Sequence, residues 1–166
     1  PSGLYRYIAG ERAEWPPEQA TAAESGWINS ARFDDARNYN PVDLNAILYR
    51  NAKIIYDLQV EAEGSGDSKL LDKSQQIQKI SSMMWDNNEN FYFDNDYVNK
   101  KLGKAKTLAG FMPLFVEMID GDTAKKLHNK LSEFVAPGGL YLSTTNGGTH
   151  SAWDHPLTVA PYIYFV

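Results

Sequence analysis

Hydrophobic residues recur at helical spacing in the stretch that begins at Val42. Five aliphatic residues follow steps of three, four and seven positions, namely Leu44, Ile47, Leu48, Ile55 and Leu58. That spacing places them on one face of an α-helix, and the charged and amide residues between them fall largely on the other faces. Two glycines flank a serine at residues 64–66 and end the pattern. The pattern therefore predicts a long helix from residue 42 to Gly64.

A second amphipathic segment follows that glycine-rich break. Asp67 or Ser68 can cap its start, because a short side-chain oxygen there accepts a backbone N–H that has no partner within the helix. A stripe predicted to be buried is formed by Leu70, Ile77, Ile80 and Met84, and the segment ends near Trp85. Two helices joined by a short break favour an antiparallel pair.

The rest of the chain predicts shorter elements. Pro16-Pro17 favours a helix start before residues 18–24, which end ahead of Gly26. A helix is expected to begin at Met112-Pro113, and another, capped by Gly121-Asp122 or Thr123, carries Ala124, Leu127, Leu131 and Phe134. Residues 91–93 are expected to form a very short strand and residues 140–144 an extended segment. The predicted class is all-α, with short irregular or extended segments.

Composition limits the class of protein. The chain has 166 residues, of which 43% are hydrophobic, and its formal charge is −5. Those figures describe about one domain's worth of chain. No apolar run approaches the roughly 20 residues of a membrane span, and Pro1–Tyr5 lacks the pattern of a targeting segment, so we expect a soluble protein whose targeting segment is absent or removed. Scattered Lys and Arg give no basic stripe, which argues against nucleic acid as a partner.

No metal site is predicted. The chain has no cysteine, so disulfides and thiolate ligands are excluded, and the cellular compartment stays open. The three histidines, His128, His150 and His155, lack the spacing of a metal site. The Asn- and Asp-rich residues 86–96 lack the central glycine and final glutamate of a calcium loop.

Residues 24–35 carry the most suggestive chemistry. They combine a carboxylate, the Ser-Gly pair that ends in Gly26, the indole of Trp27, the amide of Asn29 and the guanidinium of Arg32. An indole face stacks on a sugar ring, and an amide and a guanidinium can hydrogen-bond hydroxyls. A surface loop with a chance polar cluster is the alternative. Arg32 in a buried ion pair with Asp34, Asp35 or Asp43 is the alternative for that side chain.

A second candidate region lies near the C-terminal end of the sequence. Trp153 is a candidate for sugar stacking, and Asp154 could orient a substrate hydroxyl. Trp153, like Trp27, could instead wall the core where helical hairpins meet. Asp154 could equally fix the turn that precedes Pro156. Both interpretations remain open for these two residues.

Six blocks of the sequence resemble the trehalase family of glycoside hydrolases and, more loosely, related enzymes with the same helical toroid. They occur in the family's order, as Glu24-Ser-Gly-Trp-Ile-Asn-Ser-Ala-Arg-Phe, Pro41-Val-Asp-Leu-Asn-Ala, Phe93-Asp-Asn-Asp-Tyr, Gly110-Phe-Met-Pro-Leu-Phe, Pro137-Gly-Gly-Leu and Trp153-Asp-His-Pro. The resemblance implies helical hairpins that form part of an (α/α)6 toroid, with residues 1–166 as a single partial domain. It places a sugar pocket at one end, formed by loops between helices.

The resemblance also implies a reaction. An inverting pair of carboxyl groups, one acid and one base, would lie roughly 6.5–9.5 Å apart on either side of a glycosidic bond. That chemistry needs no metal or other cofactor. The implied partner is a small carbohydrate, and the rest of a longer chain would complete the toroid. The apolar run of residues 157–166, which ends abruptly, also leads us to expect a longer polypeptide.

Two departures from the family pattern concern catalysis. The residue after the tryptophan of the first block is the family's general acid, an aspartate, and here it is Ile28. The expected base lies in a glycine-rich block nearer the family's C-terminus, and this chain contains no such block. A diverged non-hydrolytic relative, a misread or engineered residue 28, or a substitute acid at Asp34 or Asp35 would each account for Ile28. The last is disfavoured, because misplacement of a reacting group by 1 Å can cost about 10²-fold in rate.

Three functions remain open on the sequence. The first is trehalase-like inverting hydrolysis of an α-linked glucose disaccharide by the intact protein. The second is a non-catalytic carbohydrate-binding or structural helical module derived from the same fold. The third is a toroid hydrolase that acts on other α-glucosides or mannosides.

Overall fold

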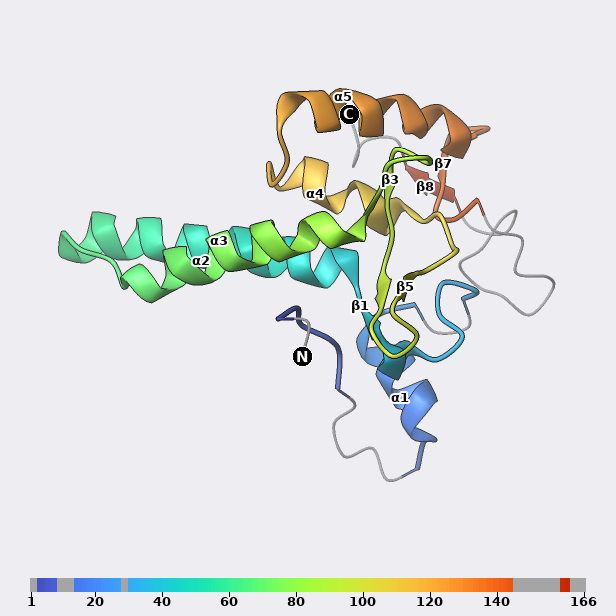
Figure 1. The fold of residues 1–166 in the computed structure, drawn as a ribbon, viewed down its shortest axis with the longest axis horizontal. Helices are drawn as coiled ribbons and strands as arrows, with labels where there is room; N and C mark the ends of the chain where they lie inside the picture. The colour runs from blue at the N-terminus through green and yellow to red at the C-terminus, as the bar shows by residue number, and fades with distance from the viewer. Residues whose placement is uncertain (1–2, 9–13, 28–29, 145–158, 162–166) are drawn as a thin grey trace.

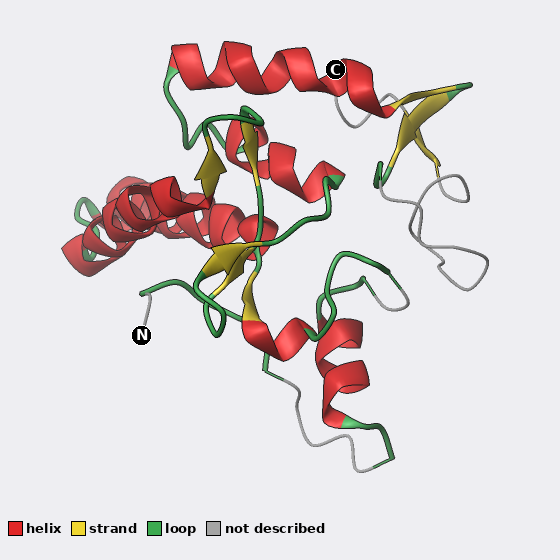
Figure 2. Cartoon of the chain, turned by 45° about the vertical axis from the view of Figure 1, so that its right-hand side comes forward, coloured by secondary structure: helices red, strands yellow, loops and turns green. Residues whose placement is uncertain are grey.

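A computed structural model of the chain describes residues 3–8, 14–27, 30–144 and 159–161, and helices dominate it (Figures 1 and 2). The α-helices are α1 (Pro17–Glu24), α2 (Val42–Glu63), α3 (Ser68–Ser81), α4 (Met112–Phe115) and α5 (Gly121–His128). Short 3-10 helices are η1 (Ala36–Asn38), η2 (Ser82–Met84), η3 (Leu108–Phe111) and η4 (Asn129–Phe134). None of the described helices is long and apolar enough to cross a membrane.

Three small antiparallel sheets connect the helices. The first has the order β1 (Tyr39–Asn40), β4 (Asn95–Asp96), β5 (Lys101–Leu102), with Tyr39 opposite Asp96. The second is the pair β2 (Trp85–Asp86) and β3 (Phe91–Tyr92), and the third joins β6 (Val135–Ala136), β7 (Gly139–Tyr141) and β8 (Val159–Pro161). The expected strand at 91–93 and extended segment at 140–144 are therefore confirmed in shortened form.

Helices α2 and α3 form the predicted antiparallel pair, which extends from the body as an arm (Figure 1). Gly64 ends α2 in the left-handed conformation, with φ of 74°, and its N–H donates to the carbonyl of Val60. Asp67 caps α3 by accepting a hydrogen bond from the Lys69 N–H. The boundaries of both helices agree with the sequence because glycine and aspartate act locally at these ends.

The face of α2 that packs on the protein is not the aliphatic one. Its buried residues are Val42, Asn45, Ala46, Tyr49 and Ala52. Ala46 and Tyr49 join Ile77 of α3 in one buried cluster. Of the aliphatic stripe that marked the helix in the sequence, Leu44 and Leu48 are half-buried and Leu48 packs against this cluster. Its other members, Ile47, Ile55 and Leu58, are exposed.

The main core lies in the body and is rich in phenylalanine. Phe91, Phe111 and Phe134 contact one another with ring centroids 5.3–6.0 Å apart. Gly110 lies directly against this cluster, and a Cβ there would be 2.6 Å from the carbonyl oxygen of Tyr92. Only glycine fits at that position without a shift of backbone.

The helix α5 starts one residue earlier than the sequence suggested. Asp120 accepts hydrogen bonds from the N–H groups of Asp122 and Thr123, so the cap is neither Gly121-Asp122 nor Thr123. Three short acceptors, Asp120, Asp122 and Thr123, lie within four residues here, and the sequence alone does not tell which of them adopts the extended backbone of a cap. The helical path continues through η4 to Phe134, which is buried as the periodicity predicted.

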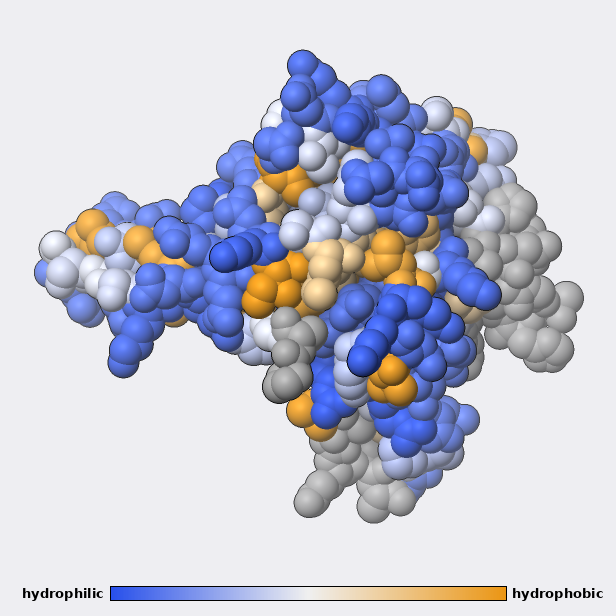
Figure 3. Space-filling model, viewed as in Figure 1, coloured by the Kyte–Doolittle hydropathy of each residue, from blue (hydrophilic) through white to orange (hydrophobic). Residues whose placement is uncertain are grey.

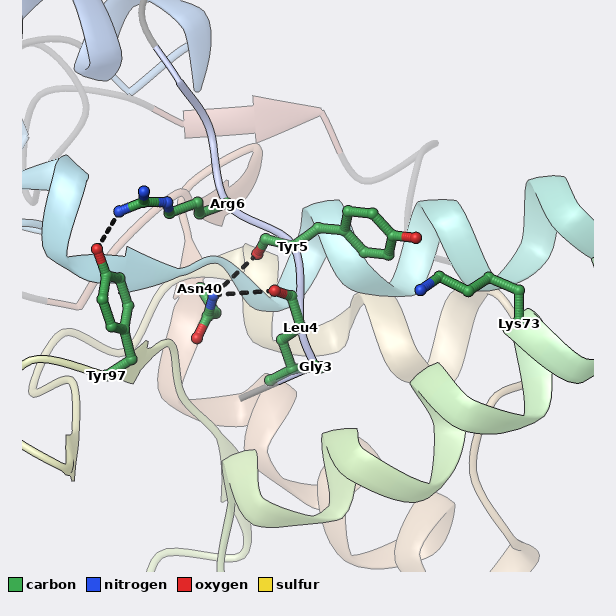
Figure 4. A pocket seen from close by; sticks show the side chains of 7 residues that line it. All are labelled: Gly3, Leu4, Tyr5, Arg6, Asn40, Lys73 and Tyr97. Atoms are coloured by element: carbon green, nitrogen blue, oxygen red, sulfur yellow. Dashed lines mark hydrogen bonds between the residues drawn. The ribbon is translucent and has the colours of Figure 1, made fainter. Parts of the chain in front are cut away.

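The N-terminal segment, residues 3–8, is held against α2 and β1 by amide side chains. Asn45 accepts from the Tyr5 N–H at 2.8 Å and donates to the Tyr5 carbonyl at 3.0 Å. Asn40 donates to the carbonyls of Tyr5 and Leu4, and it accepts from Asn95 at 3.0 Å (Figure 4). The asparagines thus replace the backbone partners that a strand would supply.

Candidate functional site

The loop that follows α1 begins at a left-handed glycine. Gly26 has φ of 76° and donates its N–H to the carbonyl of Ala23, which ends the helix. The Ser25 hydroxyl then accepts from the Trp27 N–H at 3.2 Å. As predicted, Trp27 lies just beyond a helix C-terminus.

Arg32 is the centre of this loop. Its side chain is fully buried and makes paired hydrogen bonds with two carboxylates. Its Nε and Nη2 donate to Asp94 at 2.8 and 2.7 Å, and its Nη1 and Nη2 donate to Asp43 at 2.8 Å each. Bidentate geometry of this kind fixes the plane as well as the position of the guanidinium.

Asp94 also caps α2. The residue before the helix is Pro41, whose side chain makes no capping hydrogen bond. The Asp94 carboxylate accepts from the Val42 N–H at 2.9 Å and so satisfies a donor that has no partner within the helix. Asp43 lies in the first turn of α2, where a negative charge is favoured by the helix dipole. Arg32 therefore ties the loop to the start of α2.

Two aromatic rings cover the guanidinium. The Arg32 Cζ lies 4.9 Å from the centroid of the Trp27 ring and 4.7 Å from that of Phe33. Trp27 is half-buried and packs against the phenylalanine-rich core. Cation–π contacts strengthen when they are removed from water, so these rings add to the hold on Arg32.

The charges in the cluster are stabilised by one another. Burial alone would lower the pKa of Arg32, but Asp94 and Asp43 outweigh it and raise that pKa. Burial alone would raise the pKa of Asp43, and the Arg32 guanidinium outweighs it and lowers that pKa. The pKa of the nearby Tyr7 hydroxyl is raised by burial and by Asp43. Arg32 and Asp43 are thus charged at neutral pH.

The structure assigns Arg32 to the buried ion pair that the sequence offered as an alternative, with Asp43 as one partner. Asp94 is the partner that sequence reasoning missed. It belongs to the block Phe93-Asp-Asn-Asp-Tyr, but it lies 62 residues from Arg32 in the chain. Binding of a sugar hydroxyl by Arg32 stays a prediction, and four hydrogen bonds to carboxylates give this side chain a positioning role.

Asp34 and Asp35, the weak candidates for a substitute acid, have other partners. Asp35 pairs with Arg37 at 2.6 Å and accepts from the Arg37 N–H, and these bonds lower its pKa. Asp34 is exposed, accepts from the Asp35 N–H and hydrogen-bonds Tyr39. A general acid needs a raised pKa, so Asp35 is poorly suited to that role.

The remaining predicted site residues lie outside the described part of the chain. They are Ile28, Asn29, Trp153 and Asp154. The described residues on either side of Ile28 and Asn29 are fixed, since Trp27 packs on the core and Arg32 is held by its carboxylates. Among the described residues, no cluster of three or more His, Asp and Glu side chains could hold a metal ion.

A cavity of about 480 Å³ lies beneath the N-terminal segment and is separate from the loop (Figure 4). Its polar side chains already contact the protein: Asn40 binds Leu4 and Tyr5, Arg6 bonds to the Tyr97 hydroxyl, and Lys73 lies over the Tyr5 ring. Because its polar side chains already have partners within the protein, the cavity is a gap beneath the N-terminal segment rather than a binding site.

Comparison with known proteins identifies relatives. Residues 9–166 match the sequence profile of the Trehalase family. The chain is 32% identical over 153 residues to the periplasmic trehalase of Citrobacter koseri and 31% identical to that of Salmonella typhimurium. Both matches cover 85% of this chain, which spans 26% of the length of each relative.

Solved structures show the same fold. Neutral trehalase from Saccharomyces cerevisiae matches with a TM-score of 0.75 and 21% identity, over 84% of this chain and 29% of that one. The GH63 mannosylglycerate hydrolase of Thermus thermophilus in complex with glucose matches with a TM-score of 0.54 and 27% identity, over 58% of this chain and 23% of that one. The predicted partial toroid of helical hairpins is thereby confirmed.

Proposed function

The chain belongs to the trehalase family, and from that premise we propose that it is part of the catalytic toroid of a glycoside hydrolase. The intact protein would hydrolyse an α-linked disaccharide of glucose with inversion. The observation that carries the proposal is the buried Arg32 cluster, which anchors the loop that contains the family's acid position. Catalytic groups must be held within a fraction of an ångström, and this cluster supplies such a hold.

The proposed roles follow from the position of each residue. Gly26 turns the chain out of α1, and Trp27 supplies an indole next to residue 28. Asn29 and Asp154 would hydrogen-bond sugar hydroxyls, and Trp153 would stack on a ring. Arg32 acts through the loop, because its donors are engaged with Asp43 and Asp94.

Inverting hydrolysis requires an acid that protonates the leaving oxygen and a base that activates water. The acid position is Ile28, and the base would come from outside the present sequence. Because isoleucine carries no proton to donate, residue 28 would limit the rate until a carboxyl group is present at that position. No metal is needed for either step.

Ile28 also favours a second candidate, a non-catalytic sugar-binding module that retains the fold. A third candidate is a toroid hydrolase with another substrate. Its support is the likeness to a mannosylglycerate hydrolase whose structure contains glucose. That likeness makes a glucose or mannose unit a reasonable ligand for either alternative.

The test compares the intact protein with its Ile28→Asp variant. Glucose release from trehalose is expected to rise about 10²- to 10⁴-fold in the variant, the usual contribution of a positioned acid. Proton NMR of freshly released glucose should show both anomers in equal amounts, as inversion of an α,α-linkage requires. Asp34→Asn is the matched control and should leave the rate of glucose release unchanged, both in the parent protein and in the Ile28→Asp variant.

The outcomes separate the candidates. Sugar binding by both proteins, measured by calorimetry, with hydrolysis by neither would support the module and overturn the enzyme. Hydrolysis of mannosylglycerate but not trehalose by the Ile28→Asp variant would support the third candidate. Equal, fast hydrolysis by both proteins would show that the acid is elsewhere.

A further inference from the structure

Lys106 links segments of the chain that are far apart in the sequence. Its Nζ lies 2.7 Å from the carboxylate of Glu89, in the turn between β2 and β3, and 2.9 Å from the carboxylate of Glu133 in η4. Glu133 also pairs with Lys130 at 2.8 Å. We call Lys106, Glu89 and Glu133 the Lys106 bridge.

The Lys106 bridge differs from an ordinary surface ion pair. The surface over α5 and η4 is mostly hydrophilic (Figure 3), and most ion pairs on such a surface contribute little to stability. The side chain of Lys106, however, is only 20% exposed, and its ammonium contacts two carboxylates at once. Burial alone would lower the pKa of Lys106, but Glu89 and Glu133 outweigh it and raise that pKa. Lys106 is therefore charged at neutral pH, and two other segments fix its position.

The backbone at Lys106 in turn fixes a third segment. Residues 106–108 pair with residues 142–144 in an antiparallel arrangement. The Lys106 carbonyl accepts from the Thr144 N–H at 3.0 Å and from the Ser143 hydroxyl at 3.3 Å. Ser143 is fully buried, so water does not compete for its hydrogen bond. The side chain of Lys106 is thus held by two segments while its backbone holds the third.

The third segment leads into one of the predicted parts of the site. Residue 144 is the last described residue before the block that contains Trp153 and Asp154. Beyond that block, β8 begins at Val159, which pairs with Tyr141 of β7. The described chain is therefore fixed on both sides of the two predicted site residues, and Lys106 lies where it enters the block.

We propose that Lys106 is a positioning residue for the sugar pocket, because its links to Glu89 and Glu133 fix the backbone that leads to Trp153 and Asp154. The inference rests on the proposed function, which assigns sugar contacts to those two residues. Lys106 acts through residues 142–144 and not by contact with the sugar. Loss of its cation would also leave the carboxylates of Glu89 and Glu133, both within 3 Å of Nζ, to repel each other.

Three variants of the intact protein test the proposal. Lys106→Met removes the charge and keeps an unbranched apolar side chain. Lys104→Met is the matched control, because it removes the same charge from an exposed side chain two residues away. Lys106→Arg keeps the cation and should behave as the parent protein does. All are compared well below the temperature at which any of them unfolds.

Amide hydrogen exchange measures how firmly Lys106 fixes the chain. Exchange at Thr144 and Leu108, whose N–H groups join the two paired segments, should become about tenfold faster in Lys106→Met. It should stay within about twofold of the parent value in Lys104→Met. Unchanged exchange in Lys106→Met would overturn the proposal, whatever sugar the protein binds.

Calorimetry with trehalose, or with mannosylglycerate if that is the sugar bound, measures the effect on the pocket. The Kd should rise about tenfold in Lys106→Met, which corresponds to the loss of roughly one hydrogen bond or stacking contact. Lys104→Met and Lys106→Arg should stay within about threefold of the parent Kd. A purely structural role for Lys106 would speed exchange at Thr144 and leave the Kd unchanged, and that result would overturn the proposal.

Failure of this inference and failure of the proposed function give different results. A parent protein that binds neither sugar would refute the proposed function, and the inference would fall with it. A parent protein that binds sugar, beside a Lys106→Met variant of equal affinity, would refute the inference alone. Neither comparison requires hydrolysis.

Discussion

The two ends of α2 break the usual rule of burial in opposite ways. At its N-terminal end, Asn45 and the Arg32 cluster are buried although they are polar or charged. Along its outer half, Ile54 and Leu58 are exposed although they are aliphatic. Both regions belong to one continuous helix, so neither helix propensity nor distance along the chain accounts for the difference.

The difference lies in where the partners are. Each polar group at the N-terminal end has its partners within this chain, and buried charges are tolerated when they are paired and hydrogen-bonded. The exposed aliphatic residues of α2 have no apolar surface packed over them among the described residues. Burial in this protein is therefore set by the available partner surface as much as by the polarity of the side chain.

Of the substitutions that test this contrast in burial, Arg32→Ala should lower the free energy of unfolding the most. It would leave the buried carboxylates of Asp43 and Asp94 without their cation, which costs about 3–5 kcal/mol of unfolding free energy. The matched control is Arg37→Ala, which removes an exposed pair with Asp35 and should leave the free energy of unfolding nearly unchanged. Urea unfolding of the 166-residue chain measures both.

Equal losses for the two arginine variants would contradict a structural role for the cluster. Should Arg32→Ala not fold at all, Asp43→Asn keeps a hydrogen-bonding side chain of the same shape and gives a smaller, measurable loss. A variant as stable as the parent protein would show that the charges are not held as the structure places them.

Asn45→Ala tests the other polar contact at this end. The substitution leaves the N–H and carbonyl of Tyr5 without their side-chain partner, and the expected loss is about 1–3 kcal/mol. Asn51→Ala, at an exposed position of the same helix, is the control and should stay within about 0.5 kcal/mol. Faster hydrogen exchange at residues 3–8 would accompany the first change only.

Much of the fold follows from local signals in the sequence. Gly64 and Asp67 fix the ends of α2 and α3, and Gly26 fixes the start of the candidate loop, because each acts within a few residues. The family resemblance placed these helices in a partial toroid. The ion pair of Arg32 with Asp43 was among the sequence alternatives.

The features that could not be predicted from the sequence depend on long-range contacts. Asp94 approaches Arg32 only because β4 pairs with β1, which brings the end of one block against the start of α2. Which face of α2 packs on α3 depends on the fit of Ala46 and Tyr49 against Ile77, whereas periodicity alone points to the richer aliphatic face. Ile28, Asn29, Trp153 and Asp154 lie outside the described residues, so their roles stay predictions.

Acid should weaken the N-terminal end of α2 specifically. The folded-state pKa of Asp43 lies below its ordinary value of 3.8, so its contribution is complete above about pH 4 and is lost as the pH falls through the folded pKa. Several exposed carboxylates titrate in the same range. The diagnostic is therefore the difference in Tm between the parent chain and Asp43→Asn, which should shrink on acidification from about pH 6 to pH 2.5. A constant difference would show that ionisation of Asp43 contributes nothing.

Leu58→Gln should have the smallest effect on the stability of the 166-residue chain. It tests the exposed outer half of α2. Loss of a leucine from a packed core costs about 2–5 kcal/mol, but Leu58 is 58% exposed, so the 166-residue chain should change by less than about 0.5 kcal/mol. In a full-length protein whose remaining helices cover this side of α2, the same substitution would place an amide in an apolar contact, and the loss should exceed about 1 kcal/mol. Thermal unfolding of both lengths measures the contrast. A loss of the same size in both would mean that Leu58 is buried within residues 1–166, and the contrast in burial between the two ends of α2 would disappear.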